Sequence, residues 1–282
     1  ATMGSPVDIQ IFGGYFPFLN NGVGSKYYKF LLLGIVIMKK AVLAAVLSVF
    51  VSAPTLAQDT QDWGYIGAGA PHKWAALNPA YSTCKTGAEQ SPVNIDRFAQ
   101  VALPPITAAY NPSALEVAND GRTVQVNYEP GSGFSVDGKA YELVQIQFHT
   151  PSEHYIDGAP YPMEAHFIHT AQDGSLAVIG VMMKVGVPNP TIEGIWQNVP
   201  MAGKVKNVSG VSIDASNLMP EDKSYYTYRG SLTTPPCREG VQWYLLKDEI
   251  ELSATQLKAF QAVYPVNARP IQDLGARTVS GN

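Results

Sequence analysis

The stretch that decides the fold of this chain is Gln145-Ile146-Gln147-Phe148-His149, which is followed by Glu164-Ala165-His166. Side chains alternate between the two faces of a β-strand, so Gln147 and His149 share one face of a first strand. His166 lies on a second strand that follows after a short connection. If the two strands are neighbours in a sheet, the side chains of Gln147, His149 and His166 converge on one point. The sequence therefore predicts a sheet that gathers two imidazoles and one amide as candidate metal ligands.

Strand patterns dominate the chain on both sides of this stretch. The predicted strands are rich in apolar, β-branched and aromatic residues, and they span residues 123–128, 143–148, 176–185 and 241–246. Asp-Gly turn pairs separate them at residues 137–138, 157–158 and 173–174. One helix is predicted over residues 253–263, with Ser253 as its N-cap. No linker-like change of composition appears after residue 60, which predicts a single domain over residues 58–282.

Residues 38–57 have the order of charged, apolar and small residues that is typical of a secretory signal peptide. Lys39 and Lys40 supply the charge, and residues 41–51 form the apolar segment. We expect cleavage after Ala57 and a periplasmic or secreted mature protein.

A membrane anchor is the alternative reading of the same region. It would join residues 30–38 to the apolar segment and place Lys39 and Lys40 inside the span, at about 2.5–3.5 kcal/mol each. This cost favours the signal peptide and a mature chain without a membrane span. Residues 1–37 precede the apparent start at Met38, and we interpret them as a non-native or mis-called extension.

Composition and charge narrow the classes of partner. The chain of 282 residues is 46% hydrophobic and 15% charged, which suits one globular domain. Loss of residues 1–57 removes four of the 19 basic and one of the 23 acidic residues, which leaves 15 and 22 and a net charge of −7. Nucleic acid and anionic membranes require basic patches, so neither is expected as a partner. In an exported protein, Cys84 and Cys237 predict one disulfide, and two buried thiols are the alternative.

Several motifs, in their order and spacing, resemble those of the bacterial, secreted type of α-class carbonic anhydrase. The resemblance runs from about residue 63 to 275, and its motifs are Trp63-Gly64-Tyr65, Gln90-Ser91-Pro92-Val93-Asn94-Ile95, residues 145–154, Met163-Glu164-Ala165-His166, Leu176-Ala177-Val178-Ile179-Gly180 and Gly230-Ser231-Leu232-Thr233-Thr234-Pro235-Pro236. It implies a mainly β fold with a large twisted, mostly antiparallel sheet of about ten strands and short peripheral helices. It also implies that Cys84 and Cys237 form the disulfide of the secreted members.

The resemblance implies a Zn²⁺ cofactor, with Gln147, His149 and His166 at the three ligand positions, the first of which is histidine in the family. The amide oxygen of Gln147 reaches as far as an imidazole nitrogen, but it is a weaker ligand for zinc, so reduced affinity is expected. Gln145 matches the residue that accepts a hydrogen bond from the first ligand, and Glu164 matches the one that orients the third. The alternative is a site without metal, in which Gln147 bonds to its neighbours.

Other matching positions carry the reaction and its substrate. Glu153 and Thr233 match the pair in which the threonine hydroxyl donates to the glutamate and orients the attacking oxygen. The remaining matches form the wall that holds carbon dioxide, and they are Ile168, Val178, Leu232, Thr234, Val241 and Trp243. The apolar members of this wall also suit an ordinary hydrophobic core. His154 matches a buried structural histidine near Glu164, and the alternation of the second strand turns His169 into the core.

Arg122 occupies the position at which fast members of the family carry a proton-shuttling histidine. Arginine stays protonated at any useful pH and cannot relay a proton, so slower turnover is expected. Otherwise, Arg122 is an ordinary solvated residue at the rim of the site.

Three functions are compatible with these residues. The first is a zinc carbonic anhydrase of reduced activity, which interconverts carbon dioxide and bicarbonate. The second is a related binding protein with a decayed metal site, which Gln147 and Arg122 favour. The third is a structural surface domain. The intact Glu153, Thr233 and Glu164 favour the enzyme; the oligomeric state cannot be predicted from the sequence.

Overall fold

A computed structural model describes residues 63–282. The predicted extension and signal peptide, residues 1–57, lie outside the described residues. Among the residues described, no helix is both long and apolar enough to cross a membrane. The strands run in chain order as β1 Asn94–Ile95, β2 Ala99–Gln100, β3 Thr107–Ala109, β4 Ser113–Asn119, β5 Val124–Asn127, β6 Gly133–Val136, β7 Lys139–His149, β8 Tyr155–Ile156, β9 Ala159–Pro160, β10 Met163–Thr170, β11 Leu176–Val185, β12 Lys204–Ile213, β13 Tyr225–Ser231, β14 Glu239–Leu246, β15 Ile250–Leu252 and β16 Ser280–Gly281.

Helices are short and lie around the sheet. The α-helices are α1 Trp74–Leu77, α2 Thr83–Thr86, α3 Pro190–Trp196 and α4 Ala254–Val263, and single 3-10 turns span Gly67–Gly69, Pro71–Lys73, Pro79–Tyr81 and Ala215–Leu218. The predicted helix is confirmed as α4, and Ser253 caps it in a capping box with Gln256. The sequence analysis missed α3, which Asn189 caps by accepting hydrogen bonds from the backbone N–H groups of Thr191 and Ile192.

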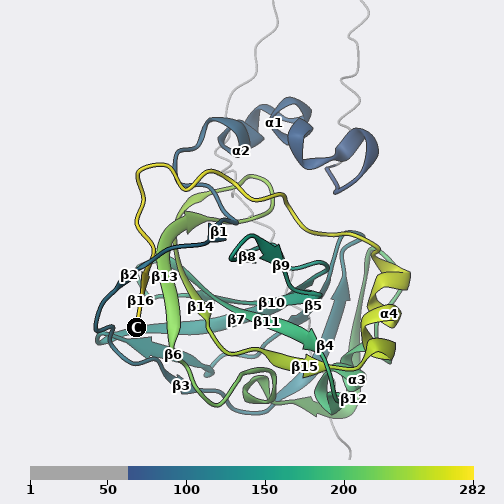
Figure 1. Cartoon of the computed structure of the whole chain (residues 1–282). Coiled ribbons are helices and arrows are strands. Elements are labelled where there is room, and N and C mark those ends of the chain that lie inside the picture. The colour runs from purple at the N-terminus through teal and green to yellow at the C-terminus, as the bar shows by residue number, and fades with distance from the viewer. Residues whose placement is uncertain (1–62) are drawn as a thin grey trace, which may run out of the picture. The chain divides into compact units, whose positions relative to one another are not determined.

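One large twisted sheet forms the centre of the domain (Figure 1). It has 13 strands, and its main path runs β12-β4-β5-β7-β10-β11-β14-β13-β16-β2. Most neighbours are antiparallel, while β11 runs parallel to β14 and β15, and β16 runs parallel to β2. The predicted mainly β fold is confirmed.

Alternation along the central strands divides the core between the two faces of the sheet. On β11, Ile179 packs into the larger apolar cluster, whereas its neighbour Val178 belongs to a smaller cluster with Val241 and Trp243. Strand β11 is buried over most of its length, as its continuous apolar run predicts. The smaller cluster forms the floor beneath the candidate site.

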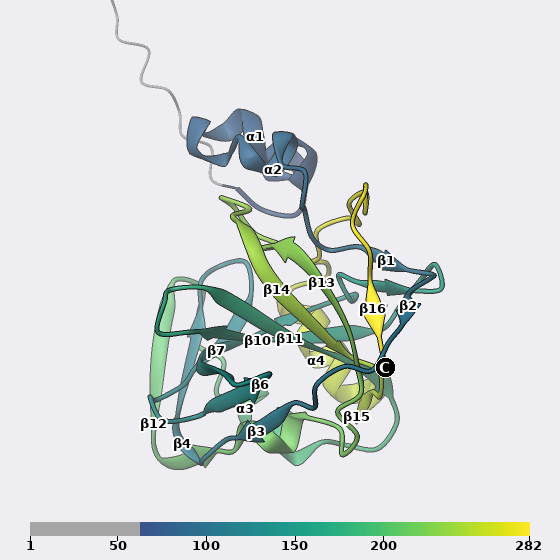
Figure 2. The same ribbon diagram turned by 90° about the vertical axis from the view of Figure 1, so that its left-hand side faces the viewer.

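The N-terminal helices lie at the tip of the β13–β14 hairpin, as two views at right angles agree (Figures 1 and 2). A disulfide joins Cys84 of α2 to Cys237 in the loop between these strands, which confirms the predicted pairing. It closes a loop of 153 residues. The connection between β13 and β14 also carries Thr233 and Thr234, so the disulfide attaches one wall of the site to the start of the domain.

Removal of this cross-link should destabilise the protein. For a loop of 153 residues, the restriction of the unfolded chain is worth on the order of 4 kcal/mol. We expect the double variant Cys84→Ser, Cys237→Ser to lose about that much free energy of unfolding, measured by equilibrium denaturation in urea. The parent protein unfolded with a thiol reductant is the control and should match the variant. Equal unfolding midpoints for oxidised parent and variant would contradict the expectation.

His169 lies on the face of β10 opposite to His166, and it makes a pH-dependent contribution to the stability of the fold. Its Nδ1 donates to the carbonyl of Phe167, and its Nε2 accepts from the hydroxyl of Tyr110. Burial lowers the pKa of His169 to about 3. The neutral ring thus stabilises the fold fully above pH 6.5, the ordinary pKa, and this stability is lost as pH falls toward 3, because the unfolded chain binds the proton first.

A variant with a side chain that does not titrate tests this contribution. Between about pH 6 and pH 4, the free energy of unfolding of the parent should fall more steeply than that of His169→Gln, by about 1.4 kcal/mol per pH unit. Glutamine retains a donor and an acceptor, so the comparison isolates the proton. Parallel slopes in denaturation at a series of pH values would show that His169 is not the group responsible.

Candidate metal centre and active site

Strand register places the candidate ligands beside one another. Gln147 of β7 is paired directly with His166 of β10, and Glu164 is paired with His149. The rings of His149 and His166 lie with their centroids 4.5 Å apart. Both imidazoles are buried, whereas Gln147 is half-buried. The structure therefore brings together the three side chains that the sequence analysis selected as ligands.

His149 keeps one ring nitrogen without a partner. Its Nδ1 donates to the backbone carbonyl of Asn267 at 2.8 Å, which leaves Nε2 as the nitrogen with a lone pair. This Nε2 is buried and has no hydrogen-bond partner among the described residues. Burial also lowers the pKa of His149, which favours the neutral ring. A buried imidazole nitrogen held in this state suits a metal ligand.

Glu164 orients His166 from a fully buried position. Its Oε1 lies 2.8 Å from Nε2 of His166 and 2.8 Å from Nδ1 of His154, while Oε2 accepts from the backbone N–H groups of Glu153 and His154. Burial alone would raise the pKa of Glu164, but the charges and hydrogen bonds of His154 and His166 hold it well below its usual value. The hydrogen bond to Nε2 leaves Nδ1 of His166 as the nitrogen on the side of the candidate site.

Gly180 makes room for this carboxylate. It is the cross-strand neighbour of His166, on β11. A Cβ atom at this position would lie 3.0 Å from Oε1 of Glu164 and 2.5 Å from Cδ1 of Leu245. Only a glycine at position 180 lets the side chains of Glu164 and Leu245 keep these positions.

Glu153 is held from the opposite side. Its Oε1 accepts from the backbone N–H of Arg269 at 2.7 Å, and its Oε2 is buried without a hydrogen-bond partner among the described residues. Oε2 lies 3.8 Å from Nδ1 of His166. Thr233 is also buried, but it does not donate to Glu153 in this structure. Their pairing therefore stays a prediction.

Two other groupings of possible ligands are less suited to a metal. His149, Glu153 and His166 bring ligand atoms within 4.8 Å of one another, but the nitrogen of His149 nearest the carboxylate is the one bonded to Asn267. His154 has both ring nitrogens occupied, by Glu164 and by the hydroxyl of Tyr228. The donor set that remains is Nε2 of His149, Nδ1 of His166 and the amide of Gln147.

One expected contact of Gln147 is wrong. The amide NH₂ donates to Oε1 of Gln125 on β5 at 3.4 Å, and not to Gln145. Residues two apart on one strand are about 7 Å apart along it, whereas residues paired directly across two strands lie about 5 Å apart. Gln125 is the direct partner of Gln147, so it reaches the amide first.

The predicted substrate wall lines a cavity of about 160 Å³ next to His166. Its lining residues are Gln145, Gln147, His166, Ile168, Leu176, Val178, Leu232, Thr233, Thr234 and Trp243. Val241 does not line it and instead lies behind it, fully buried beside Val178 and Trp243. The cavity is thus apolar on one side and polar on the side of the candidate ligands.

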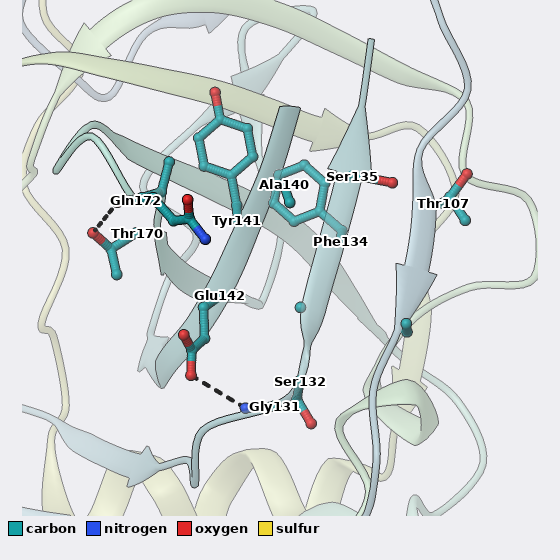
Figure 3. A pocket seen from close by; sticks show the side chains of 13 residues that line it. Thr107, Gly131, Ser132, Phe134, Ser135, Ala140, Tyr141, Glu142, Thr170 and Gln172 are labelled. Atoms are coloured by element: carbon teal, nitrogen blue, oxygen red, sulfur yellow. Dashed lines mark hydrogen bonds between the residues drawn. The ribbon is translucent and has the colours of Figure 1, made fainter. Parts of the chain in front are cut away.

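A larger cavity of about 440 Å³ lies elsewhere, between β3, β6 and the start of β7 (Figure 3). It contains none of the predicted site residues. Its one charged group, Glu142, already accepts a hydrogen bond from the backbone N–H of Gly131 (Figure 3). It offers no imidazole or second carboxylate for catalysis.

Arg122 is more constrained than a solvated rim residue, which corrects that part of the sequence interpretation. It is half-buried, its Nε donates to the backbone carbonyl of Trp63 at 2.8 Å, and its guanidinium lies 4.3 Å from the centre of the Trp63 ring. Trp63 in turn packs edge-on against Trp74. Arg122 therefore fastens the N-terminal segment to the turn between β4 and β5.

Sequence reasoning missed Gln125, Asn267 and Arg269. Asn267 and Arg269 lie in the irregular segment after α4, and they support His149 and Glu153 through backbone groups. Such contacts depend on the tertiary fold, so the local sequence pattern carries no signal of them. The alternation of β5 does mark Gln125 as facing the same side as Asn127, but only strand register brings it to Gln147.

Known proteins are similar to this chain in sequence and in structure. The family model for eukaryotic-type carbonic anhydrases matches residues 69–282. A carbonic anhydrase of Neisseria gonorrhoeae is 44% identical over 220 residues, which cover 77% of this chain and 86% of that protein. One of a Nostoc species is 40% identical over 246 residues, covering 85% and 92% respectively. Among solved structures, a hyperthermostable carbonic anhydrase from an active hydrothermal vent chimney has a TM-score of 0.76 and 46% identity, with 78% of this chain and 99% of that chain covered.

Proposed function

We propose that this chain, which belongs to the eukaryotic-type, or α-class, carbonic anhydrase family, is a zinc-dependent enzyme. We expect its activity to be lower than that of a three-histidine relative. The family and its bacterial relatives support the reversible hydration of carbon dioxide to bicarbonate, a lyase reaction, as the activity. The observation that carries the zinc proposal is the buried Nε2 of His149, which no described residue satisfies. An unsatisfied buried nitrogen costs free energy unless a ligand pairs with it.

Three side chains would hold the metal: His149 through Nε2, His166 through Nδ1 and Gln147 through its amide oxygen. When bound, zinc supplies a Lewis acid that lowers the pKa of a water molecule, a chemistry for which carbonic anhydrases are themselves the standard example. The amide is a weaker donor to zinc than imidazole, so lower affinity and slower reaction are expected.

The surrounding residues would bind the substrate and aim the nucleophile. The apolar side of the cavity, formed by Ile168, Val178 and Trp243, suits carbon dioxide, which carries no net charge or dipole. Thr233 lies in the wall of the same cavity, where its hydroxyl can accept a hydrogen bond from the attacking oxygen and donate one to Glu153. The partnerless Oε2 of Glu153 is the atom available to accept that hydrogen bond.

Export to the periplasm or beyond the cell is part of the proposal. Two features support it, the signal-like residues 38–57 and the disulfide between Cys84 and Cys237. Disulfides persist in oxidising compartments and are rare in the cytosol.

A binding protein without catalysis is the second candidate. The hydrogen bond from Gln147 to Gln125 favours it, because a polar partner can satisfy this side chain without a metal. Zinc binding and carbon dioxide hydration by the purified protein distinguish the two candidates.

Restoration of the third imidazole should strengthen zinc binding. The parent is expected to bind about one zinc per chain, and Gln147→His should bind it more tightly by about tenfold or more and hydrate carbon dioxide faster. Chelator competition on untagged protein and stopped-flow hydration measure the two effects. Gln145→His is the matched control: it lies two residues away on the same face but opposite Ile168, and it should not tighten binding. A parent without zinc or activity under any zinc concentration would leave the binding protein as the function.

Arg122→His should affect only the transfer of protons to buffer. In low buffer its turnover should rise with a pH dependence near the ordinary histidine pKa of about 6.5, because a neutral imidazole can accept a proton. In saturating buffer, turnover and zinc affinity should equal those of the parent. Arg122→Gln removes the same charge but cannot relay, so it should show no gain. An equal gain in both variants would assign the effect to charge or to the released Trp63 contact.

A further inference from the structure

Gln147 occupies the middle of a polar row that crosses three strands. The strands β5, β7 and β10 are consecutive in the sheet, and register pairs Gln147 with Gln125 on one side and His166 on the other. The amide nitrogen of Gln147 donates to Oε1 of Gln125 at 3.4 Å. Gln147 and His166 both line the cavity of the candidate site.

The two ends of an amide are not equivalent toward a cation. The carbonyl oxygen carries the lone pairs, whereas the NH₂ group is a donor only and cannot ligate. Free rotation would present either end to the site. The hydrogen bond to Gln125 turns the NH₂ group toward β5 and leaves the oxygen as the end that can face His166.

We infer that Gln125 is a positioning residue, which orients the Gln147 amide so that its oxygen is offered to the metal. The inference rests on the proposed function, because it assigns a role within the same zinc site. In a three-histidine site the first ligand would donate its hydrogen bond to the position of Gln145, as the family resemblance implies, so Gln125 is expected to matter only while position 147 holds an amide. Gln125 is itself held in place, because its neighbours Val124 and Val126 are fully buried in the core.

The test compares two changes at Gln125 in two backgrounds of the full mature chain. Gln125→Met keeps the approximate length but cannot accept a hydrogen bond, and Gln125→Glu keeps the acceptor. Each is made in the parent and in the Gln147→His background, and zinc dissociation constants are measured by chelator competition. Asn127→Leu is the matched control: Asn127 lies on the same strand and face, is also half-buried, and donates to Glu116 and not to Gln147.

Gln125→Met should weaken zinc binding on the order of tenfold in the parent, as is typical when the partner of a ligand is removed, and should have no effect in the Gln147→His background. Gln125→Glu adds a negative charge, and its effect on zinc affinity in the Gln147→His background measures the contribution of that charge alone. Once this contribution is subtracted, Gln125→Glu in the parent should bind zinc as tightly as the parent itself. Asn127→Leu should leave zinc affinity unchanged. The visible spectrum of the cobalt-substituted protein should change with Gln125→Met in the parent background alone, which a merely structural role would not produce.

The outcomes separate this inference from the proposed function. If the parent binds zinc and Gln125→Met changes the dissociation constant equally in both backgrounds, or in neither, the positioning role is overturned and the zinc enzyme stands. If Asn127→Leu weakens zinc as much as Gln125→Met, the effect belongs to β5 as a whole and the role is likewise overturned. If only the Gln147→His background binds zinc, the proposed function of the natural chain fails first.

Discussion

The carboxylate of Glu164 lies beyond the reach of solvent at the centre of the sheet, and its charge must be balanced there. The imidazoles of His154 and His166 and two backbone N–H groups provide this balance. The connection from β7 to β8, the orientation of His166 and the packing of Gly180 all depend on it. Removal of one imidazole would leave this buried charge less well compensated; breaking a buried ion pair typically costs about 3–5 kcal/mol. The site is therefore inseparable from the core of the sheet.

The two imidazoles of the site are held by different means, and the amide by a third. His166 is oriented by a side-chain carboxylate, His149 by a backbone carbonyl and Gln147 by a neutral amide. The carboxylate opposes the effect of burial, so the pKa of His166 is raised while burial lowers that of His149. The weakest of these partners orients the candidate ligand that is expected to bind zinc most weakly. In the proposed zinc site, two firmly oriented imidazoles would accompany a weaker third ligand, which reconciles Gln147 with the proposal.

Periodicity in the sequence predicted the features that depend on local pattern. The alternation of residues 145–149 and the apolar run of β11 predicted strands, and Ser253 predicted the start of α4. Gln125 could not be predicted as the partner of Gln147, because register depends on the pairing of segments that are distant in sequence. Asn267 and Arg269 reach His149 and Glu153 through backbone groups, and their side chains bond to segments that are distant in sequence, so no local pattern marks them. The role of Trp63 as the partner of Arg122 likewise required the tertiary contact.

The position of β16 in the sheet has a consequence for the synthesis of the protein. This strand lies between β13 and β2, and it pairs Ser280 with Ala99. β2 emerges from the ribosome early but has no strand to join until the last residues of the described chain have been made. This edge of the sheet is therefore completed only once residues 280–281 are available to pair with both β13 and β2. Such long-range closure is slow compared with local pairing. The topology thus makes the closure of β2 a late step in the folding of the domain.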